Sequence, residues 1–455
     1  MAAGKGTRMK SRLPKVLHRL GGRPLIGHVV ATAAALGARS VVVVTGHGAA
    51  EVEQWLAGAT GGVPPKFVRQ EPQLGTGHAV QQAVPLLPDD GITLILNGDV
   101  PLVRAETLRA LVERCAGDKL ALLTVAMPDP TGYGRIVREG DAVQSIVEHK
   151  DASAAQRLIA EVYTGFMAAP TRELKRWLAQ LRNDNAQGEY YLTDIVQLAV
   201  AGGTPVVASS AQDRVEVDGV NSPVQLAELE RAFQARTARA LLEQGVRLAD
   251  PARLDVRGEL HCGQDVEIDV NCVFEGKVTL ADGVRIGANC VIANAQIAAG
   301  AVIHPFTHIE GEQAGVYVGE GALVGPFARL RPGARLGPEV HIGNFVEVKN
   351  SELARGAKAN HLAYLGDATV GERVNYGAGS ITANYDGANK HRTVIEADVH
   401  VGSNCVIVAP VTVAAGGTIG AGSVINRDTP AGTLSVARAR QTSIAGWQRP
   451  KKSAR

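Results

Sequence analysis

Short apolar runs alternate with longer helix-like stretches along the first half of the chain. The runs have the length of single strands and are apolar throughout, which is typical of strands buried on both faces. Such strands, alternating with helices, predict an α/β domain with a mostly parallel sheet that binds ligands at the carboxyl ends of its strands. The strand runs are Val41–Thr45, Ile92–Leu96, Ala121–Val125 and Val206–Ala208, and the helical stretches include Ile26–Leu36, Ala49–Leu56, Gly77–Leu86 and Ala105–Arg114.

The pattern changes near residue 223. Gln225–Glu243 is rich in helix formers and contains neither Gly nor Pro, and Gly245 stands where a helix would stop. This segment predicts one long helix that joins two domains. The predicted divisions are a first domain at 1–222, a linker helix at 223–245, and a second domain with a C-terminal tail at 246–455.

From about residue 250 onward, apolar or small residues recur at every sixth position, often followed by Gly. This period is the hexapeptide signature of a parallel β-helix, in which about 18 residues make one coil, so that roughly ten coils are expected. Two segments break the period, Asn350–Asn360 and Ala383–Thr393, and we expect both to be loops on a binding face. One uninterrupted series is Val256, Cys262, Ile268, Phe274, Leu280, Ile286 and Ile292.

Composition narrows the class of protein. A chain of 455 residues is too long for one ordinary core, and its net charge of +2 does not indicate a nucleic-acid or membrane-surface binder. No apolar stretch is long enough for a transmembrane helix, and no apolar run follows the basic residues at the N-terminus as in a signal peptide. The five cysteines form no CxxC pair, which favours reduced thiols in a cytoplasmic protein; Cys272 and Cys290 should stack on neighbouring coils without a bond.

The N-terminal segment Ala2–Met9 is rich in Gly and basic residues. Successive N–H groups in such a loop can cradle phosphate, and Arg8 and Lys15 can neutralise its charge. The segment lacks the G-x-x-x-x-G-K-[ST] pattern of a P-loop, and alone it is also compatible with an ordinary turn.

A carboxylate follows the second strand run. Asp99 lies at the expected ligand edge of the sheet, where it could hold Mg²⁺ or simply cap a loop. Gln70 and Leu74–His78 offer amide, hydroxyl and backbone groups suited to reading a base.

His361 is the main chemical candidate of the repeat half. A single His is more often structural than catalytic, but polar and basic residues fall in the same few coils and favour a site. These residues are Arg331, Lys349, Tyr364 and Asn375.

Longer motifs connect these features. The first half contains AAGKGTRM, QEPQLGTGHA, NGDVPL, TGYGRI, VEHKD, QGEYYLTD and VDGVN, and the second contains LRPGA, GNFVEVKN, HLAYLGDA, NYGAGSITANYDGANKH and GSNCVIVAPVTV. Together they resemble the family of bifunctional N-acetylglucosamine-1-phosphate uridyltransferases/glucosamine-1-phosphate acetyltransferases, over essentially the whole chain and in the same domain order. The resemblance implies a Rossmann-like nucleotidyltransferase domain followed by a left-handed parallel β-helix, and an enzyme of UDP-N-acetylglucosamine biosynthesis.

The resemblance also implies a nucleotide-sugar site. In this site, UTP and N-acetylglucosamine 1-phosphate would react with each other, and pyrophosphate would leave. Asp99 and Asn221 would hold Mg²⁺, and Gly134 and Glu148 would touch the sugar. The residues expected to bind the nucleotide sugar are Ala2, Ala3, Gly4, Lys15, Gln70, Gly75, Thr76, Asn97, Gly98, Asp99, Gly134, Glu148, Tyr163 and Asn221.

For the second half, the resemblance makes His361 the general base that takes a proton from the glucosamine amine as it attacks acetyl-CoA, a role worth about 10²–10⁴ in rate. Glu347 would orient His361. The resemblance implies a homotrimer with shared acetyl-transfer sites, which also suits the flat apolar faces of a β-helix. The sugar phosphate would be bound by Arg331, Lys349, Tyr364 and Asn375, and acetyl-CoA by Ala378, Asn384, Tyr385, Ser403, Ala421 and Arg438.

The sequence departs from the family pattern at two points. Tyr163 stands where the family has a sugar-contacting Asn before Thr-Gly-Phe. The family also has a strand before AAGKG, so we expect several residues rich in Val or Ile to precede Met1 in the natural protein.

Two other functions remain open from sequence. The β-helix could serve assembly only, leaving one activity, or the whole chain could be a scaffold without turnover. The cluster around His361 argues against the first, and Asp99 with Asn221 argues against the second.

Overall fold

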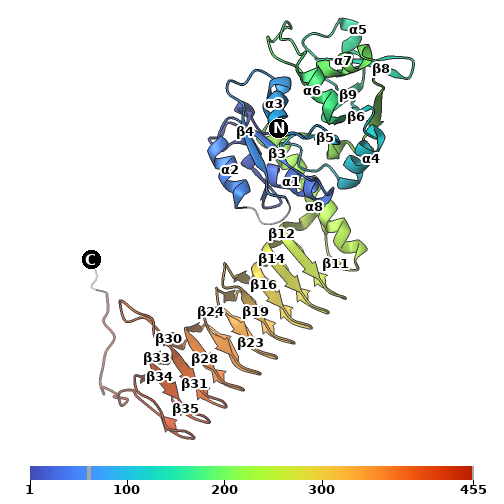
Figure 1. The fold of residues 1–455 in the computed structure, drawn as a ribbon. Helices are drawn as coiled ribbons and strands as arrows, with labels where there is room; N and C mark the ends of the chain where they lie inside the picture. Colours follow the sequence, from blue (N-terminus) through green and yellow to red (C-terminus); the bar gives the residue numbers. More distant parts are fainter. Residues whose placement is uncertain (59–62, 453–455) are drawn as a thin grey trace. The chain divides into compact units, whose positions relative to one another are not determined.

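The computed structural model describes residues 1–58 and 63–452, which form two compact units, Met1–Gln234 and Ala235–Arg455 (Figure 1). The division falls inside the long helix α8 (Pro223–Glu243), whose residues are strong helix formers. Each unit has its own buried apolar clusters, and each is described by itself below.

The larger sheet of the first unit is mixed rather than mostly parallel. Its longest strand, β9 (Glu161–Pro170), runs antiparallel to β5, β6 and β7, whereas β10 and β6 are parallel. β9 was hidden in the sequence because Thr164 and Gly165 interrupt its apolar pattern, although nearly all of it is buried. The other strands of this sheet are β5 (Ile92–Ile95), β6 (Leu120–Ala126), β7 (Arg135–Glu139), β8 (Ala142–Val147) and β10 (Val206–Ser210).

Helices surround these strands, and the four helical stretches expected from the sequence are confirmed within a few residues. The helices of the first unit before α8 are α1 (Leu25–Ala35), α2 (Ala49–Ala57), α3 (Thr76–Ala83), α4 (Ala105–Cys115), α5 (Ala154–Arg157), α6 (Thr171–Leu178) and α7 (Ile195–Ala201), with short 3₁₀ turns at Thr7–Met9, Lys15–Leu17, Val84–Leu86, Leu192–Asp194 and Arg214–Glu216.

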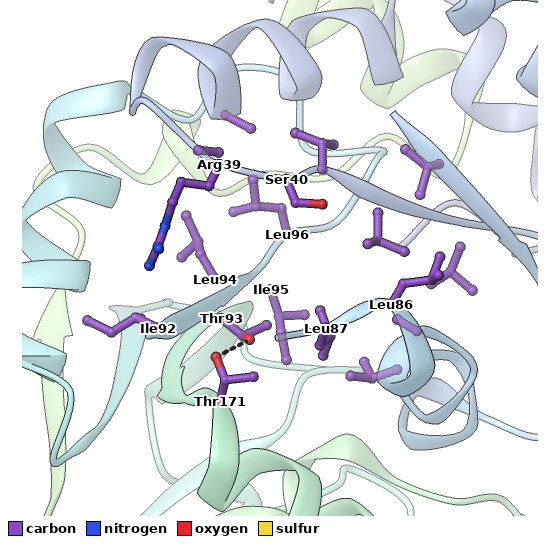
Figure 2. Close-up of a pocket in the computed structure, with 18 of the residues that line it drawn as sticks. Arg39, Ser40, Leu86, Leu87, Ile92, Thr93, Leu94, Ile95, Leu96 and Thr171 are labelled. Carbon is purple, nitrogen blue, oxygen red and sulfur yellow. Dashed lines mark hydrogen bonds between the residues drawn. The ribbon is translucent and has the colours of Figure 1, made fainter. Parts of the chain in front are cut away.

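A second, two-stranded parallel sheet consists of β3 (Val42–Thr45) and β4 (Lys66–Arg69), and a short hairpin pairs β1 (Arg19–Leu20) with β2 (Arg23–Pro24). A cavity of about 320 Å³ lies between β3 and β5. Its lining is mainly apolar, and Figure 2 shows the side chains of the β5 segment gathered around it. Met1 lines one end of this space. The next residue is tied to β3, because Ala2 N–H donates to the Val44 carbonyl at 2.8 Å and Ala2 forms a parallel bridge with Thr45.

The second unit is a parallel β-solenoid, as its six-residue period predicts. One of its sheets contains eleven strands, one from each successive coil. The periodic residues point inward, and Ile268, Ile286 and Ile303 are register partners in successive coils. The strands of this sheet are β11 (Arg247–Leu248), β13 (Glu267–Ile268), β15 (Arg285–Ile286), β17 (Val302–Ile303), β20 (Leu323–Val324), β23 (His341–Asn344), β26 (Lys358–His361), β29 (Asn375–Tyr376), β32 (His400–Val401), β35 (Thr418–Ile419) and β37 (Leu434–Ser435).

The remaining strands form a sixteen-stranded network over the other faces of the solenoid. The long strands of the first coils serve both faces, since β16 pairs with β18 and with β19. These strands are β12 (Leu254–Cys262), β14 (Cys272–Leu280), β16 (Val291–Ile297), β18 (His308–Glu310), β19 (Val316–Val318), β21 (Arg329–Leu330), β22 (Arg335–Leu336), β24 (Glu347–Lys349), β25 (Glu352–Leu353), β27 (Tyr364–Gly366), β28 (Ala368–Val370), β30 (Ile381–Ala383), β31 (Thr393–Ile395), β33 (Val406–Val408), β34 (Val411–Val413) and β36 (Val424–Ile425).

Only one of the two expected insertions is a loop outside the coils. The prediction for Asn350–Asn360 is wrong, because this segment contains β25 and begins β26 in regular register. Ala383–Thr393 is a true insertion, and the coil that contains it runs from Ala368 to its register partner Thr393.

One corner of the solenoid carries exposed apolar residues on four successive coils. Phe306, Phe327 and Phe345 stack with ring centroids 4.9 and 5.3 Å apart, and Leu362 follows them. All four have positive φ, which is costly for bulky residues.

The five cysteines are free, which confirms the prediction for Cys272 and Cys290. No helix in the described part of the chain is long and apolar enough to cross a membrane.

Candidate active sites

Three expected phosphate and metal residues of the first unit meet at one point. The Lys15 ammonium forms an ion pair with Asp99 and donates a hydrogen bond to Asn221 Oδ1 at 3.1 Å. The backbone brings the two acceptors together, because Val220 N–H donates to the Asp99 carbonyl at 2.9 Å. Carboxylate and amide oxygens therefore converge on one cation, as they would on a metal ion.

The loop before Asp99 is held closely by its neighbours. Gly98 N–H donates to the Met1 carbonyl at 2.8 Å. The Asn97 amide lies against Gly165, whose φ of 90° and lack of a side chain permit this approach. Asn97, Gly98 and Asp99 are thus fixed beyond the end of β5.

The residues expected to read the base form a second group. Gln70 is buried, and its side-chain amide donates to the Gly75 carbonyl at 2.8 Å. Thr76 begins α3, and its hydroxyl accepts from Leu192 N–H at 3.1 Å. Ala2 and Ala3 are buried and Gly4 is exposed, so the backbone of the N-terminal loop passes from the core to solvent here.

The expected sugar residues form a third group. Tyr163 N–H donates to the Gly134 carbonyl at 2.9 Å. Glu148 accepts from the Thr193 hydroxyl at 3.0 Å, and burial raises the pKa of its carboxyl group. The neighbouring Asp194, which sequence reasoning missed, also has its pKa raised by burial, to about 6.

In the second unit, register places the expected sugar-phosphate residues on adjacent coils. Arg331 follows β21 and Lys349 ends β24, at equivalent positions of paired strands. The Tyr364 phenol lies over Gly366, the register partner of Lys349. Two cations and a phenol therefore share one patch of the solenoid face. Asn375 lies on the neighbouring sheet, in register with Lys358.

A further cation, Lys390, was missed by the sequence analysis. It lies in the inserted loop, where its backbone forms an isolated antiparallel β-bridge with Tyr385. The Lys390 ammonium lowers the pKa of Lys349. Asp367 anchors the loop by accepting from the buried amide of Asn384. The sequence did contain a signal for this residue, because Lys390 is a basic residue within a segment that breaks the six-residue period.

His361 begins a column of expected residues along the other sheet. The register of β26, β29, β32 and β35 places Ala378, Ser403 and Ala421 at equivalent positions in the coils that follow. Arg438 ends the column, since its guanidinium donates to the Ala421 carbonyl at 2.6 Å. All the expected acetyl-CoA residues outside the inserted loop thus lie along one line.

The expectation that Glu347 orients His361 is not supported by the contacts. Glu347 accepts from Arg331 at 2.7 Å, and its carboxylate lies 3.7 Å from Arg329. The partner of His361 is Asn344, whose Oδ1 lies 2.9 Å from His361 Nδ1. The two residues are 17 positions apart, so one coil of the solenoid, rather than a local motif, brings them together.

Comparison with known proteins agrees with the division of the chain into two units. Residues 1–248 match the model of the MobA-like NTP transferase domain, and residues 315–350 match six repeats of the bacterial transferase hexapeptide model. The chain is 72% identical to the bifunctional protein GlmU of Albidiferax ferrireducens, over 99% of both chains. It is 74% identical to that of Polaromonas naphthalenivorans, over 99% of this chain and 97% of the relative, and 60% identical to that of Thiobacillus denitrificans, over 99% and 96%.

The chain belongs to the bifunctional GlmU family. Its two units are accordingly a nucleotidyltransferase and a hexapeptide-repeat transferase, and it is a bifunctional enzyme acting on small-molecule substrates. The GlmU relatives extend over both units, so both candidate sites lie within the matched region.

Proposed function

We propose that the protein makes UDP-N-acetylglucosamine in two steps. The second unit acetylates glucosamine 1-phosphate with acetyl-CoA, and the first transfers UMP from UTP to the resulting N-acetylglucosamine 1-phosphate. The observation that carries the proposal is that each separately folded unit contains its own cluster of charged side chains suited to a sugar phosphate.

In the uridylyl transfer, the N-terminal loop and the basic residues Arg8 and Lys15 hold the triphosphate. They offset the repulsion between UTP and the sugar phosphate, whose oxygen attacks the α-phosphorus while pyrophosphate leaves. Gln70 and Gly75 hold the base. Gly134, Glu148 and Tyr163 face the sugar.

Asp99 and Asn221 would hold Mg²⁺. The donor set fits, because both oxygens already share one cation, the Lys15 ammonium. Among the described residues no group of three or more His, Cys, Asp or Glu side chains could hold a metal. Mg²⁺ commonly takes one or two protein carboxylates together with phosphate oxygens and water, and when bound it neutralises phosphate charge. Lys15 is then free to contact the triphosphate.

In the acetyl transfer, the cations Arg331, Lys349 and Lys390 bind the sugar phosphate. Like charges this close repel one another, and a phosphate dianion between them removes that repulsion. His361 takes the proton as the glucosamine nitrogen attacks the thioester carbonyl, and the CoA thiolate leaves. Acetyl-CoA lies along the column from Ala378 to Arg438, beside Asn384 and Tyr385.

The assembly we propose is a homotrimer in which neighbouring copies complete each acetyl-transfer site. Support comes from the apolar corner of Phe306, Phe327, Phe345 and Leu362, whose side chains are about half exposed. An exposed apolar strip of this kind marks a protein interface. The proposed location is the cytoplasm, where unpaired cysteines and both co-substrates are expected.

Two variants test the function together. With glucosamine 1-phosphate, acetyl-CoA, UTP and Mg²⁺, Asp99→Ala should abolish pyrophosphate release and leave CoA release unchanged. His361→Ala should lower CoA release by at least about 100-fold, while N-acetylglucosamine 1-phosphate that is supplied directly with UTP and Mg²⁺ is still uridylylated. Loss of both activities in either variant, or of neither, would contradict the assignment of one site to each unit.

A further inference from the structure

Asn344 is the neighbour of His361 one coil earlier in the solenoid. It ends β23, His361 ends β26, and the two are register partners. Side chains at equivalent positions of adjacent coils stack about 4.8 Å apart. The backbone fixes this pair further, because Leu362 N–H donates to the Asn344 carbonyl at 3.0 Å. Asn344 is therefore held where its side chain reaches the imidazole.

The contact between the two side chains favours one of the two tautomers of the imidazole. His361 Nδ1 lies 2.9 Å from Asn344 Oδ1. An amide oxygen only accepts hydrogen bonds, so this contact stabilises the tautomer in which Nδ1 carries the hydrogen and donates it. In the neutral ring, Nε2 then has a free lone pair, which is the form that a general base requires.

Asn344 is a neutral partner in a region with several titratable groups. Lys358 begins the strand that His361 ends, whereas His341 and His304 come from earlier coils of the same sheet. Burial lowers the pKa of His341, and Lys358, His304 and His361 lower it further. An amide orients His361 without adding a charge to this group, whereas a carboxylate would stabilise the protonated imidazole.

We propose that Asn344 is a positioning residue for acetyl transfer, which fixes the ring orientation of His361 and keeps Nε2 as the basic nitrogen. This inference rests on the proposed role of His361. Nothing in a hexapeptide pattern singles out Asn344, because its partner is defined by coil register and not by sequence spacing within a motif.

Substitutions at position 344 separate orientation from packing. Asn344→Ala removes the acceptor, so kcat for acetyl transfer should fall about 10- to 100-fold, the range found for partners that orient a metal-binding His through the same kind of hydrogen bond. The KM values for glucosamine 1-phosphate and acetyl-CoA should stay within about twofold, because Asn344 is not expected to bind either substrate. Asn344→Asp keeps the acceptor oxygen but adds a charge. Its acetyl-transfer activity should recover at high pH, and the pH at which activity is lost on acidification should move up by about one unit at low salt.

Asn360→Ala is the matched control. Asn360 precedes His361 on the same strand, and its Oδ1 is buried without a partner among the described residues. Its kcat should remain within about twofold. If Asn360→Ala lowers kcat as much as Asn344→Ala does, or if Asn344→Asp leaves the pH profile in place, the effect is one of packing and the inference is wrong.

Failure of the proposed function can be distinguished from failure of the positioning role of Asn344. If His361→Ala abolishes acetyl transfer while both Asn344 variants behave as the parent, the function stands and only the positioning role fails. If His361→Ala is itself active, another group is the base and the proposed chemistry of this site fails first.

Discussion

The Tyr163 phenol is buried at the sugar end of the first site, and its hydroxyl has no hydrogen-bond partner among the described residues. Burial raises the pKa of this phenol well above its ordinary value, and the nearby Glu148 adds to the effect. A buried hydroxyl without a partner costs about 1–3 kcal/mol, so the protein retains Tyr163 against a local penalty. Its ring packs in the same buried cluster as Ile136 and Ile146.

At this scale the first prediction concerns sugar affinity. Tyr163→Asn shortens the side chain and supplies both a donor and an acceptor, so the KM for N-acetylglucosamine 1-phosphate should fall about fivefold, the value of roughly one hydrogen bond. Initial rates of pyrophosphate release measure it. Tyr163→Phe, which removes only the hydroxyl, is the control and should leave KM unchanged. A higher KM in Tyr163→Asn would mean that Tyr163 makes a productive contact of its own.

At the scale of elements, the repeated period allowed the architecture of the second unit to be predicted from sequence. Inward positions of a solenoid must be apolar in every coil, so the period predicted the architecture, and Ile268, Ile286 and Ile303 stack as expected. Partners across coils were not readable in the same way. Asn344 and Lys390 reach the site through register and through an inserted loop, and neither belongs to the periodic pattern. β9 was missed because Thr164 and Gly165 interrupt its apolar run.

The cavity between β3 and β5 leads to the second prediction. Both strands border it, and the bridge of Ala2 to Thr45 sets a parallel register at one end. An extension Val-Val-Ile-Leu joined to Met1 would run beside Val44 and Leu94 and bury its side chains in the apolar lining. Buried side chains contribute about 1.5–3 kcal/mol each, largely offset by chain ordering of about 1–2 kcal/mol per residue.

Backbone hydrogen bonds to both strand edges add about 1 kcal/mol each, so we expect a net gain of about 2–4 kcal/mol. The Tm of the first unit should rise by about 5–10 °C, measured by calorimetry. A Gly-Ser-Gly-Ser extension of the same length can form hydrogen bonds but buries almost no apolar surface, so it should raise the Tm much less. Equal shifts for the two extensions would show that the cavity does not accept an apolar strand.

At the scale of the whole molecule, the two units have separate cores and separate sites. The solenoid builds one continuous apolar cluster from its own coils, whereas the first unit contains several clusters from its sheets and helices. In a repeat structure each coil is stabilised mainly by its neighbours in the stack. Each of these buried clusters is made of residues from its own unit, so we expect each unit to fold and act on its own.

The last prediction follows from this independence. A variant that ends at Ala249 keeps all of the first unit and α8 and lacks the solenoid with its exposed apolar corner. It should uridylylate N-acetylglucosamine 1-phosphate at a rate within a few-fold of the full chain and release no CoA. Because the corner of Phe306, Phe327, Phe345 and Leu362 is the proposed interface, the variant should sediment as a monomer while the full chain sediments as a trimer.

A full-length Phe327→Glu variant separates the role of the interface from the loss of the whole solenoid. It places a charge in the proposed interface, so it should weaken the trimer and lower acetyl transfer while uridylyl transfer continues. A trimer that persists in the truncated variant would place the interface in the first unit, and a loss of uridylyl transfer there would show that the first site needs the solenoid.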